Sequence, residues 1–210
     1  MGELTLRDGA SRQAAGAYLA RLVRLDPSAL VRLRPTPAGA VEVWAMLPFG
    51  VLVTRAVLAA VDQDVTVLAA DLLAAVGRAD GPERWQVAMP RRRDLDWRWS
   101  LPSGSGQEVE RLLAADVRQV SAAAAATVSE VGATGLAGRA VGQRALRDAL
   151  LDHVPFVITQ DTAAGGGDTV AVPQRLVQAV MRMGFVADDD ATVGVSTTER
   201  RSVGCGCRTT

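Results

Sequence analysis

The chain has 210 residues, with 23 basic and 23 acidic side chains and a formal net charge of zero. Every basic residue is arginine, which excludes sites that require a lysine amine: the phosphate-binding P-loop, the pyridoxal phosphate Schiff base and the strand lysine of protein kinases. A neutral chain also lacks the net positive charge that attracts polyanions. Hydrophobic residues make up 49% of the chain, which is enough to bury a core.

The amphipathic and alternating patterns of the first half predict an α+β unit. Apolar residues at three- and four-residue steps predict a helix over 11–25, which Asp8 or Ser11 caps and Pro27 ends. The period then changes to two. It predicts strands at 30–34, 41–47, 51–54 and 65–67, the first two joined as a hairpin, and a short helix at 68–76. We therefore expect an N-terminal helix with a small antiparallel sheet.

The Pro-Ser-Gly-Ser-Gly stretch at 102–106 is the best boundary between two subdomains. We place an N-terminal α+β subdomain at 1–102, a helix-rich subdomain with a hairpin at 103–196, and a flexible tail at 197–210. The second subdomain is predicted to hold helices over 107–131 and 139–153. A hairpin of strands 155–159 and 169–172, a helix that starts after Pro173, and a short strand at 192–196 follow.

The fold class is therefore α+β, and the helix, hairpin and helix after residue 139 are partly similar to the later part of a winged-helix domain. In that arrangement Arg139, Gln143, Arg144 and Arg147 would face a nucleic-acid groove or its phosphates. Two observations oppose it: one long helix replaces the two short ones such domains have beforehand, and Asp148 and Asp152 dilute the charge. The alternative is a helix packed on a hairpin, with its arginines in solvent.

The segment 91–99, Arg-Arg-Arg-Asp-Leu-Asp-Trp-Arg-Trp, carries the most suggestive pattern. Arginine pairs with phosphates while tryptophan rings stack on bases, as in proteins that bind single strands or RNA. The candidate nucleic-acid-binding residues of this segment are Arg91, Arg92, Arg93, Trp97, Arg98 and Trp99. In the alternative interpretation, Asp94 and Asp96 neutralise the arginines and both tryptophans lie in the core, as in a half-buried strand.

The chain offers few metal ligands. His153 is the single histidine, and Cys205 and Cys207 are the two cysteines. Paired thiolates suit soft metals, but a closed zinc site needs four ligands, so a second copy would have to complete it. We expect instead that the cysteines lie in the flexible tail, and we predict no metal site and no cofactor.

The start of the chain has no apolar stretch of the kind found in secretory signals. The longest apolar run lies between Glu42 and Arg55 and is interrupted by Pro48, whereas a membrane-spanning helix takes roughly 20 residues. We therefore expect a soluble cytoplasmic protein that does not associate with membranes.

Two hypotheses on function follow from these residues. The first is a non-catalytic interaction protein that binds a protein or a nucleic acid, because no acid, base and nucleophile set is evident and no catalytic residue is assigned. The alternative is a small enzyme, a hydrolase or transferase, that uses carboxylates and arginine on a phosphorylated or anionic substrate.

The stretches at 6–22, 47–57 and 181–185 resemble an uncharacterised conserved protein family of high-GC Gram-positive bacteria. The resemblance spans most of the chain, up to about Val195, and implies neither an activity nor site residues. The preference for arginine over lysine agrees with such a source, because arginine codons are GC-rich.

Overall fold

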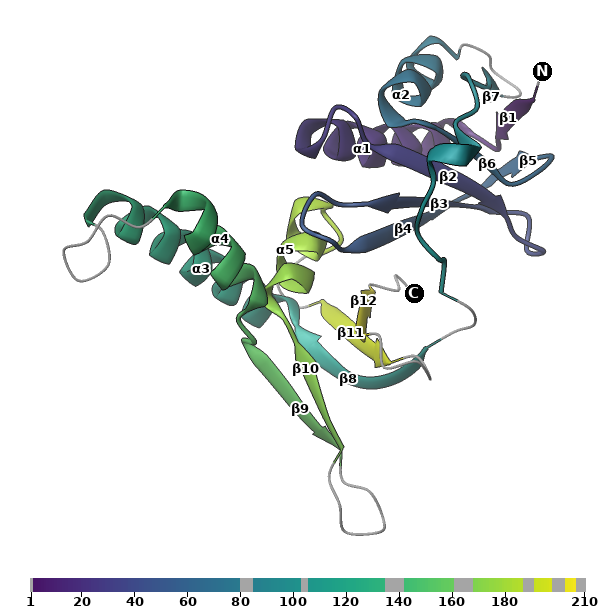
Figure 1. Cartoon of the computed structure of the whole chain (residues 1–210). Coiled ribbons are helices and arrows are strands. Elements are labelled where there is room, and N and C mark those ends of the chain that lie inside the picture. Colours follow the sequence, from purple (N-terminus) through teal and green to yellow (C-terminus); the bar gives the residue numbers. More distant parts are fainter. Residues whose placement is uncertain are drawn as a thin grey trace. The chain divides into compact units, whose positions relative to one another are not determined.

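The computed structural model describes residues 2–79, 85–102, 106–134, 142–160, 168–186, 191–197 and 203–206. The chain divides into two compact units, Met1–Leu101 and Pro102–Thr210, each with its own helices and sheets (Figure 1). The predicted α+β fold is confirmed. The sequence places the subdomain boundary one residue later, after residue 102.

The first unit is built on a four-stranded antiparallel sheet. Its spatial order is β4-β3-β2-β6, with β2 at Leu30–Pro35, β3 at Val41–Met46, β4 at Leu52–Val57 and β6 at Val65–Leu68. A smaller sheet has the order β5-β1-β7, with β1 at Glu3–Leu6, β5 at Ala59–Val61 and β7 at Trp85–Ala88. Helices α1 (Gly9–Leu25) and α2 (Ala69–Arg78) lie on one side of the larger sheet (Figure 1).

Helix α1 starts and packs as its sequence predicts. The Asp8 carboxylate accepts a hydrogen bond from the Ser11 backbone N–H at 2.7 Å, which satisfies one of the free donors at the helix start. One face of the helix, with Tyr18, Leu19 and Leu22, is almost fully buried. It forms the core of this unit with the apolar face of the sheet.

Alternation along β2 gives the four-stranded sheet two different faces. Val31 and Leu33 are fully buried toward the helices. Arg32 lies between them and therefore points to the opposite face. Strand β6 pairs with β2 on one side only, so its other side is the free edge of the sheet.

In its described residues, the second unit combines three helices with two small sheets. Its helices are α3 (Ala114–Thr134), α4 (Gln143–Asp152) and α5 (Gln174–Arg182). Strands β9 (Phe156–Gln160) and β10 (Asp168–Val172) form the predicted hairpin, and a second sheet has the order β12-β11-β8, with β8 at Gln107–Leu113, β11 at Thr192–Thr197 and β12 at Val203–Gly206. Its core is built by Val117, Val177, Val180 and Val193 next to a cluster around Ile158, Val172 and Val195.

The predicted long helix over 107–131 is wrong at its start, because residues Gln107–Leu113 form strand β8. This strand pairs with β11 in antiparallel register, with Leu112 opposite Val193. Val109 and Leu112 then pack against the core of the unit. The local sequence is compatible with a helix, but a distant strand provides the better burial for its apolar residues.

The structure also differs from the expected tail over 197–210. Residues Val203–Gly206 add a strand, β12, to the edge of β11, with Cys205 opposite Val195. Few apolar side chains are available here, but backbone hydrogen bonds to an open strand edge do not require them.

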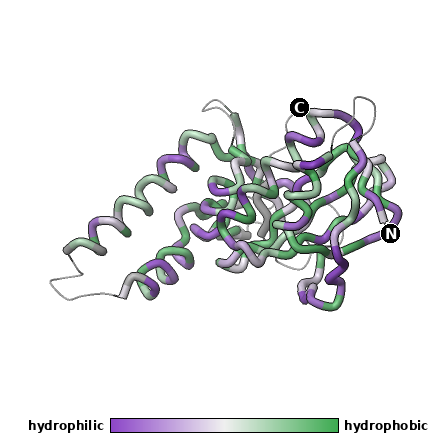
Figure 2. Tube along the Cα trace, turned by 90° about the horizontal axis from the view of Figure 1, so that it is seen from above, coloured by the Kyte–Doolittle hydropathy of each residue, from purple (hydrophilic) through white to green (hydrophobic). Residues whose placement is uncertain are grey.

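The last helix of the chain ends as the sequence predicts. Gly184 has a φ of +64°, and the Phe185 backbone N–H donates to the Val180 carbonyl at 2.9 Å, as in a left-handed helix cap. The other two helices of the second unit differ in their hydropathy (Figure 2). Helix α3 is pale green along its alanine run, whereas α4 alternates between hydrophilic and hydrophobic residues. Among the residues that the structure describes, no helix is long and apolar enough to cross a bilayer.

Tyr18 makes the stability of the first unit sensitive to alkaline pH. Its hydroxyl is buried and donates to the Val53 carbonyl at 3.2 Å. Burial raises the pKa of Tyr18 far above its usual value, against the opposing charge of Arg55. In the unfolded chain the Tyr18 hydroxyl ionises at about pH 10, whereas in the folded chain it stays neutral. The free energy of unfolding is therefore unaffected by Tyr18 below that pH and decreases above it.

The effect of Tyr18 on the pH dependence of unfolding can be measured without a signal from another tyrosine. Tyr18 is the only tyrosine, so tyrosinate absorbance reports on it alone, and the absence of lysine leaves few other groups that titrate between about pH 10 and 12. We predict that tyrosinate absorbance appears together with unfolding. Tyr18→Phe should lower the free energy of unfolding at neutral pH by about 1 kcal/mol and remove the alkaline decrease. Tyrosinate absorbance in a still-folded chain would contradict the buried position.

Candidate binding surface

The Arg–Trp segment is held against the free edge of strand β6. A short 3-10 helix at Asp94–Asp96 follows the extended residues after β7. The Arg93 backbone N–H donates to the Thr66 carbonyl at 2.7 Å, and the Thr66 N–H donates to Asp94 Oδ1 at 2.7 Å. Both backbone groups that Thr66 directs away from the sheet are therefore bonded by this segment, which closes the sheet edge at that point.

Two ion pairs form between side chains within the segment. Arg92 Nε lies 2.7 Å from Asp94 Oδ2, and Arg93 forms an ion pair with Asp96. The alternative interpretation of the sequence expected this neutralisation. The two acidic residues thus take up the charge of two of the three consecutive arginines.

A third ion pair, between Arg32 and Asp64, lies beside the segment and is linked to it through Arg92. Arg32 donates two hydrogen bonds to Asp64, at 2.7 and 2.8 Å, and these bonds raise the pKa of Arg32. The Asp64 carbonyl in turn accepts a long hydrogen bond from Arg92, at 3.4 Å. Because these groups are partly exposed, each ion pair contributes only about 0–1 kcal/mol. They position the segment more than they stabilise the fold.

Opposing effects act on the Asp94 carboxylate. Burial raises its pKa, but the hydrogen bonds from the Thr66 N–H and Arg92 and the charges of Arg92 and Arg32 outweigh burial, so the pKa is lowered overall. Asp94 therefore stabilises the attached segment above the usual carboxyl pKa of about 4, and this contribution is lost as the pH falls through the lowered value.

The two tryptophans lie edge to face on the surface. Their ring centroids are 5.1 Å apart at an interplanar angle of 81°, and Trp97 Nε1 donates to the Trp99 carbonyl at 2.6 Å. The Arg32 guanidinium lies 5.9 Å from the centroid of Trp97. Trp97 is half-buried and Trp99 is 37% exposed. The alternative interpretation, which places both rings in the core, is therefore wrong.

Leu95, between the two aspartates, is 94% exposed. Sequence reasoning missed it, because alternation in an extended segment would place it beside the tryptophans, whereas the 3-10 turn carries it into solvent. Its flanking aspartates, each bonded to an arginine, are the signal that could have indicated such a turn. All side chains of this segment are exposed or half-buried, and we call those that take part in no ion pair within the described residues the Arg–Trp surface: Arg91, Leu95, Trp97, Arg98 and Trp99.

A surface cavity of about 280 Å³ opens at the start of the segment. Arg91 and Arg92 contribute to its wall together with the turn between β5 and β6. The core of the first unit offers much less room, since the cavity among its apolar residues is about 10 Å³, no larger than one water molecule requires. The lining residues of the surface cavity are Gly2, Val61, Asp62, Gln63, Val65, Met89, Pro90, Arg91 and Arg92.

The remaining candidate arginines belong to the second unit. Arg144 and Arg147 are exposed on α4, and Arg139 lies outside the described residues. The neighbouring strand β8 pairs with β11, while β9 and β10 pair with each other. The six candidates of segment 91–99 therefore belong to the first unit, and Arg144 and Arg147 belong to the second.

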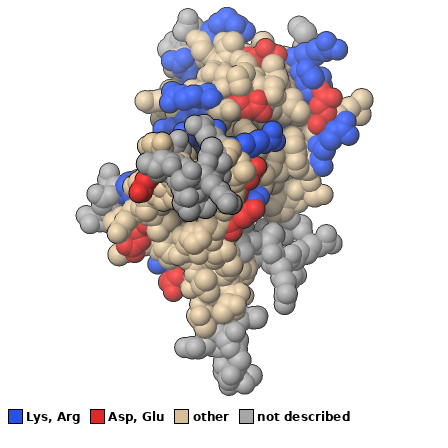
Figure 3. Space-filling view, turned by 60° about the vertical axis from the view of Figure 1, so that its left-hand side comes forward, with Lys and Arg blue, Asp and Glu red and all other residues tan. Residues whose placement is uncertain are grey.

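Charges of both signs are mixed on the surface. On the face drawn in Figure 3, basic groups lie next to acidic ones and do not form a continuous basic area. Within the described part of the chain, Arg91 and Arg98 form no ion pair, and no group of three or more His, Cys, Asp or Glu residues is placed to hold a metal ion.

We predict that Asp94→Ala releases the segment without unfolding the core. Loss of a charge-assisted hydrogen bond of about 1.5 kcal/mol should raise the population of the open segment, and with it trypsin cleavage after Arg91, Arg92 or Arg93, roughly tenfold. Asp96→Ala is the matched control, because it removes an arginine partner but no bond to Thr66. Equal cleavage rates in the two variants would show that the bond to Thr66 does not hold the segment.

Comparison with known proteins matches both halves of the chain. A family model described as "Domain of unknown function (DUF8010)" matches residues 1–99, and a second, "Domain of unknown function (DUF8185)", matches residues 101–202. No curated protein matches the chain. The resemblance to an uncharacterised family is thereby confirmed, while its bacterial source stays a prediction. The chain combines two domains of unknown function, each of which corresponds closely to one compact unit.

Proposed function

We propose that this chain is a non-catalytic interaction protein of the cytoplasm that binds a protein partner through the Arg–Trp surface. The observation that carries the proposal is the 94% exposure of Leu95 next to the edge-to-face tryptophan pair. A large apolar side chain held out on a turn gains nothing from folding. It gains free energy when a partner covers it.

The composition of the surface favours a protein over a nucleic acid. Tryptophan and arginine are the residue types that most often dominate the energy of protein interfaces. Arg92 and Arg93 are already paired with carboxylates, so they offer phosphates little free charge. Leu95 can bury apolar area against a protein, but it provides no flat ring for a base.

The surface is also pre-organised for binding. Two interactions limit the rotamers of Trp97 before any partner arrives. They are the hydrogen bond from its ring N–H to the Trp99 carbonyl and the contact with Arg32. The backbone of the segment is held at Thr66. Little conformational entropy is then lost on binding, which preserves affinity.

Nucleic acid is the second candidate, favoured by the partly exposed Trp99 ring next to Arg98, which forms no ion pair with any residue that the structure describes. If this candidate holds, exchange of Arg91, Arg92 and Arg93 to glutamine together should weaken binding of a labelled single-stranded oligonucleotide. It should also reduce the salt dependence of that binding, because fewer counterions are released. The winged-helix-like arrangement of α4 with Arg144 and Arg147 belongs to this candidate.

The enzyme hypothesis has one place in the described residues where it could apply, the 280 Å³ cavity that Asp62, Arg91 and Arg92 help to line. One carboxylate with two arginines could hold an anionic substrate. Among the described residues, no second carboxylate for acid–base work lines this cavity, so we rank the hypothesis below binding.

The proposal predicts that Leu95→Ser combined with Trp99→Ser abolishes partner capture. The full chain, immobilised and exposed to nuclease-treated lysate of its source cells, should retain specific proteins at least thirtyfold better than the double variant, the ratio expected for a loss of about 2 kcal/mol at an interface hot spot. Leu58→Ser is the matched control, because Leu58 is 44% exposed on the same unit outside the Arg–Trp surface. It should leave capture unchanged.

Equal capture by the double variant and the wild type would refute the proposal, as would capture that occurs only in lysate that was not treated with nuclease. Thermal unfolding of all three proteins controls for stability. The backbone carbonyl of Trp99 remains in the double variant, so the hydrogen bond from the Trp97 ring is retained.

A further inference from the structure

We propose that the surface cavity at the start of the Arg–Trp surface is an anchor pocket for one aliphatic side chain of the protein partner, and that an acidic residue next to that side chain pairs with Arg91. This inference rests on the proposed protein-binding function. It adds the chemical class of the segment that is bound.

The lining of the cavity divides into an apolar part and a polar part. Val61, Val65, Met89 and Pro90 supply apolar surface from β5, β6 and the residues after β7. Val65 is buried, and Val61 and Met89 are half-buried, so these side chains are held by the fold. The polar part consists of exposed residues. An occupant with an apolar end and polar neighbours matches this division.

The size of the cavity is compatible with an inserted side chain of a partner. Its volume of about 280 Å³ lies just below the range of about 300–1,000 Å³ in which ligand sites enclose most of a drug-sized molecule. A single leucine, isoleucine or methionine side chain needs far less room. Anchor residues at protein interfaces are side chains that fill such pockets.

The charges around the cavity indicate an acidic neighbour. Arg92 is paired with Asp94, whereas Arg91 has no ion pair within the described part of the chain. Asp62 also lines the cavity and would repel a carboxylate on the side of the turn between β5 and β6. An acidic side chain of the partner is therefore favoured on the Arg91 side of the pocket.

The mode of recognition follows from the closed sheet edge. Arg93 and Asp94 already bond the outward N–H and carbonyl of Thr66, so a partner cannot add a strand to β6 at that point. Recognition must then rely on side chains. Arg91 and Arg92 belong both to the cavity wall and to the segment that leads to Leu95 and the tryptophans, so the pocket continues into the Arg–Trp surface.

A random peptide library displayed on phage and selected on the full wild-type chain tests this inference. Enriched peptides should share an aliphatic residue next to aspartate or glutamate. Gly2→Phe should fill the pocket, because Gly2 is one of its lining residues. The fold should tolerate the change, since a Cβ at Gly2 would lie 3.9 Å from the Met89 Cβ, which is an ordinary contact. It should weaken binding of synthetic enriched peptides at least tenfold.

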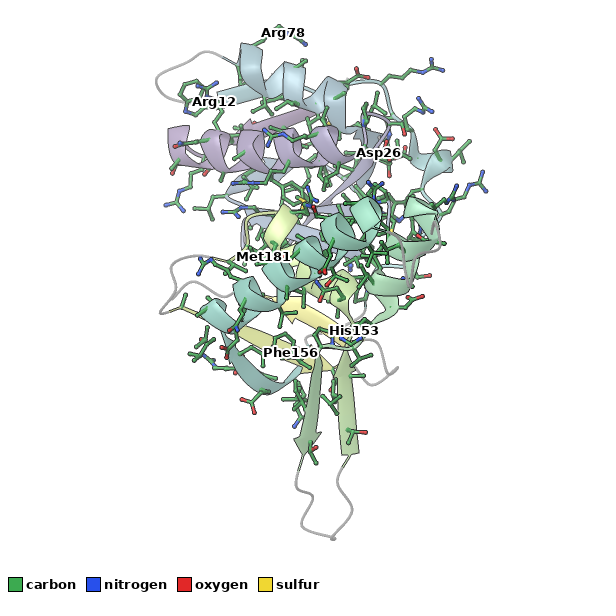
Figure 4. The ribbon with its side chains drawn as sticks, turned by 90° about the vertical axis from the view of Figure 1, so that its left-hand side faces the viewer. Arg12, Asp26, Arg78, His153, Phe156 and Met181 are labelled. Carbon is green, nitrogen blue, oxygen red and sulfur yellow. The ribbon has the colours of Figure 1, made fainter. Side chains whose placement is uncertain are left out.

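Charge reversal at Arg91, which is exposed, gives a second test. Arg91→Glu should weaken the same peptides at least tenfold, whereas Arg78→Glu, at the end of α2 (Figure 4), should not. Replacement of the peptide's acidic residue by its amide should remove the difference between wild type and Arg91→Glu. Peptides that lose binding with Trp99→Ser but not with Gly2→Phe or Arg91→Glu would overturn the pocket and leave the Arg–Trp surface intact. Absence of enrichment, or insensitivity to all three variants, would overturn both.

Discussion

The free edge of strand β6 is the constraint on which the candidate site depends. An edge strand directs backbone N–H and carbonyl groups outward, and unless they are bonded they invite pairing with other chains. Here the Arg93 N–H and the Asp94 carboxylate bond both outward groups of Thr66. A requirement of the sheet therefore determines where the Arg–Trp segment lies.

The positions of the aromatic and apolar side chains follow from that attachment. With Asp94 held at the sheet edge, the short 3-10 helix turns Leu95 into solvent, and the chain then returns so that the Trp97 ring comes within reach of Arg32 on the open sheet face. The ion pairs around these residues are partly exposed and contribute little free energy. Their role is to reduce the freedom of the segment, which suits a binding surface better than a core.

Local signals predicted those elements whose structure depends on neighbouring residues. The Asp8 cap, the hairpin between β9 and β10 and the glycine cap after α5 all follow from a few adjacent residues, and all are present. Strands β1, β5 and β7 were not predicted, since each has four residues or fewer and exists by pairing with distant partners. Strand β8 has seven residues and was mistaken for a helix because its partner, β11, is distant in sequence.

The candidate site was predictable only in part. The interleaving of arginine and tryptophan identified the segment, and the aspartates correctly indicated neutralised arginines. Its surface position was not predictable, because that depends on Thr66, which is distant in sequence and carries no chemical signal of its own. The cavity likewise combines Gly2, the turn after β5 and the residues after β7, and no sequence pattern connects these three places.

A photo-crosslinking side chain in place of Leu95 tests the central claim most directly, with the same side chain at Leu58 as the reference. Both positions are exposed on the same unit, Leu95 by 94% and Leu58 by 44%, so a side chain at either position can meet proteins in chance encounters. The account predicts that illumination of the source cells crosslinks position 95, and not position 58, to a specific protein through a contact that nuclease does not remove. Crosslinks from position 95 to nucleic acid, or the same crosslinked species from both positions, would contradict it.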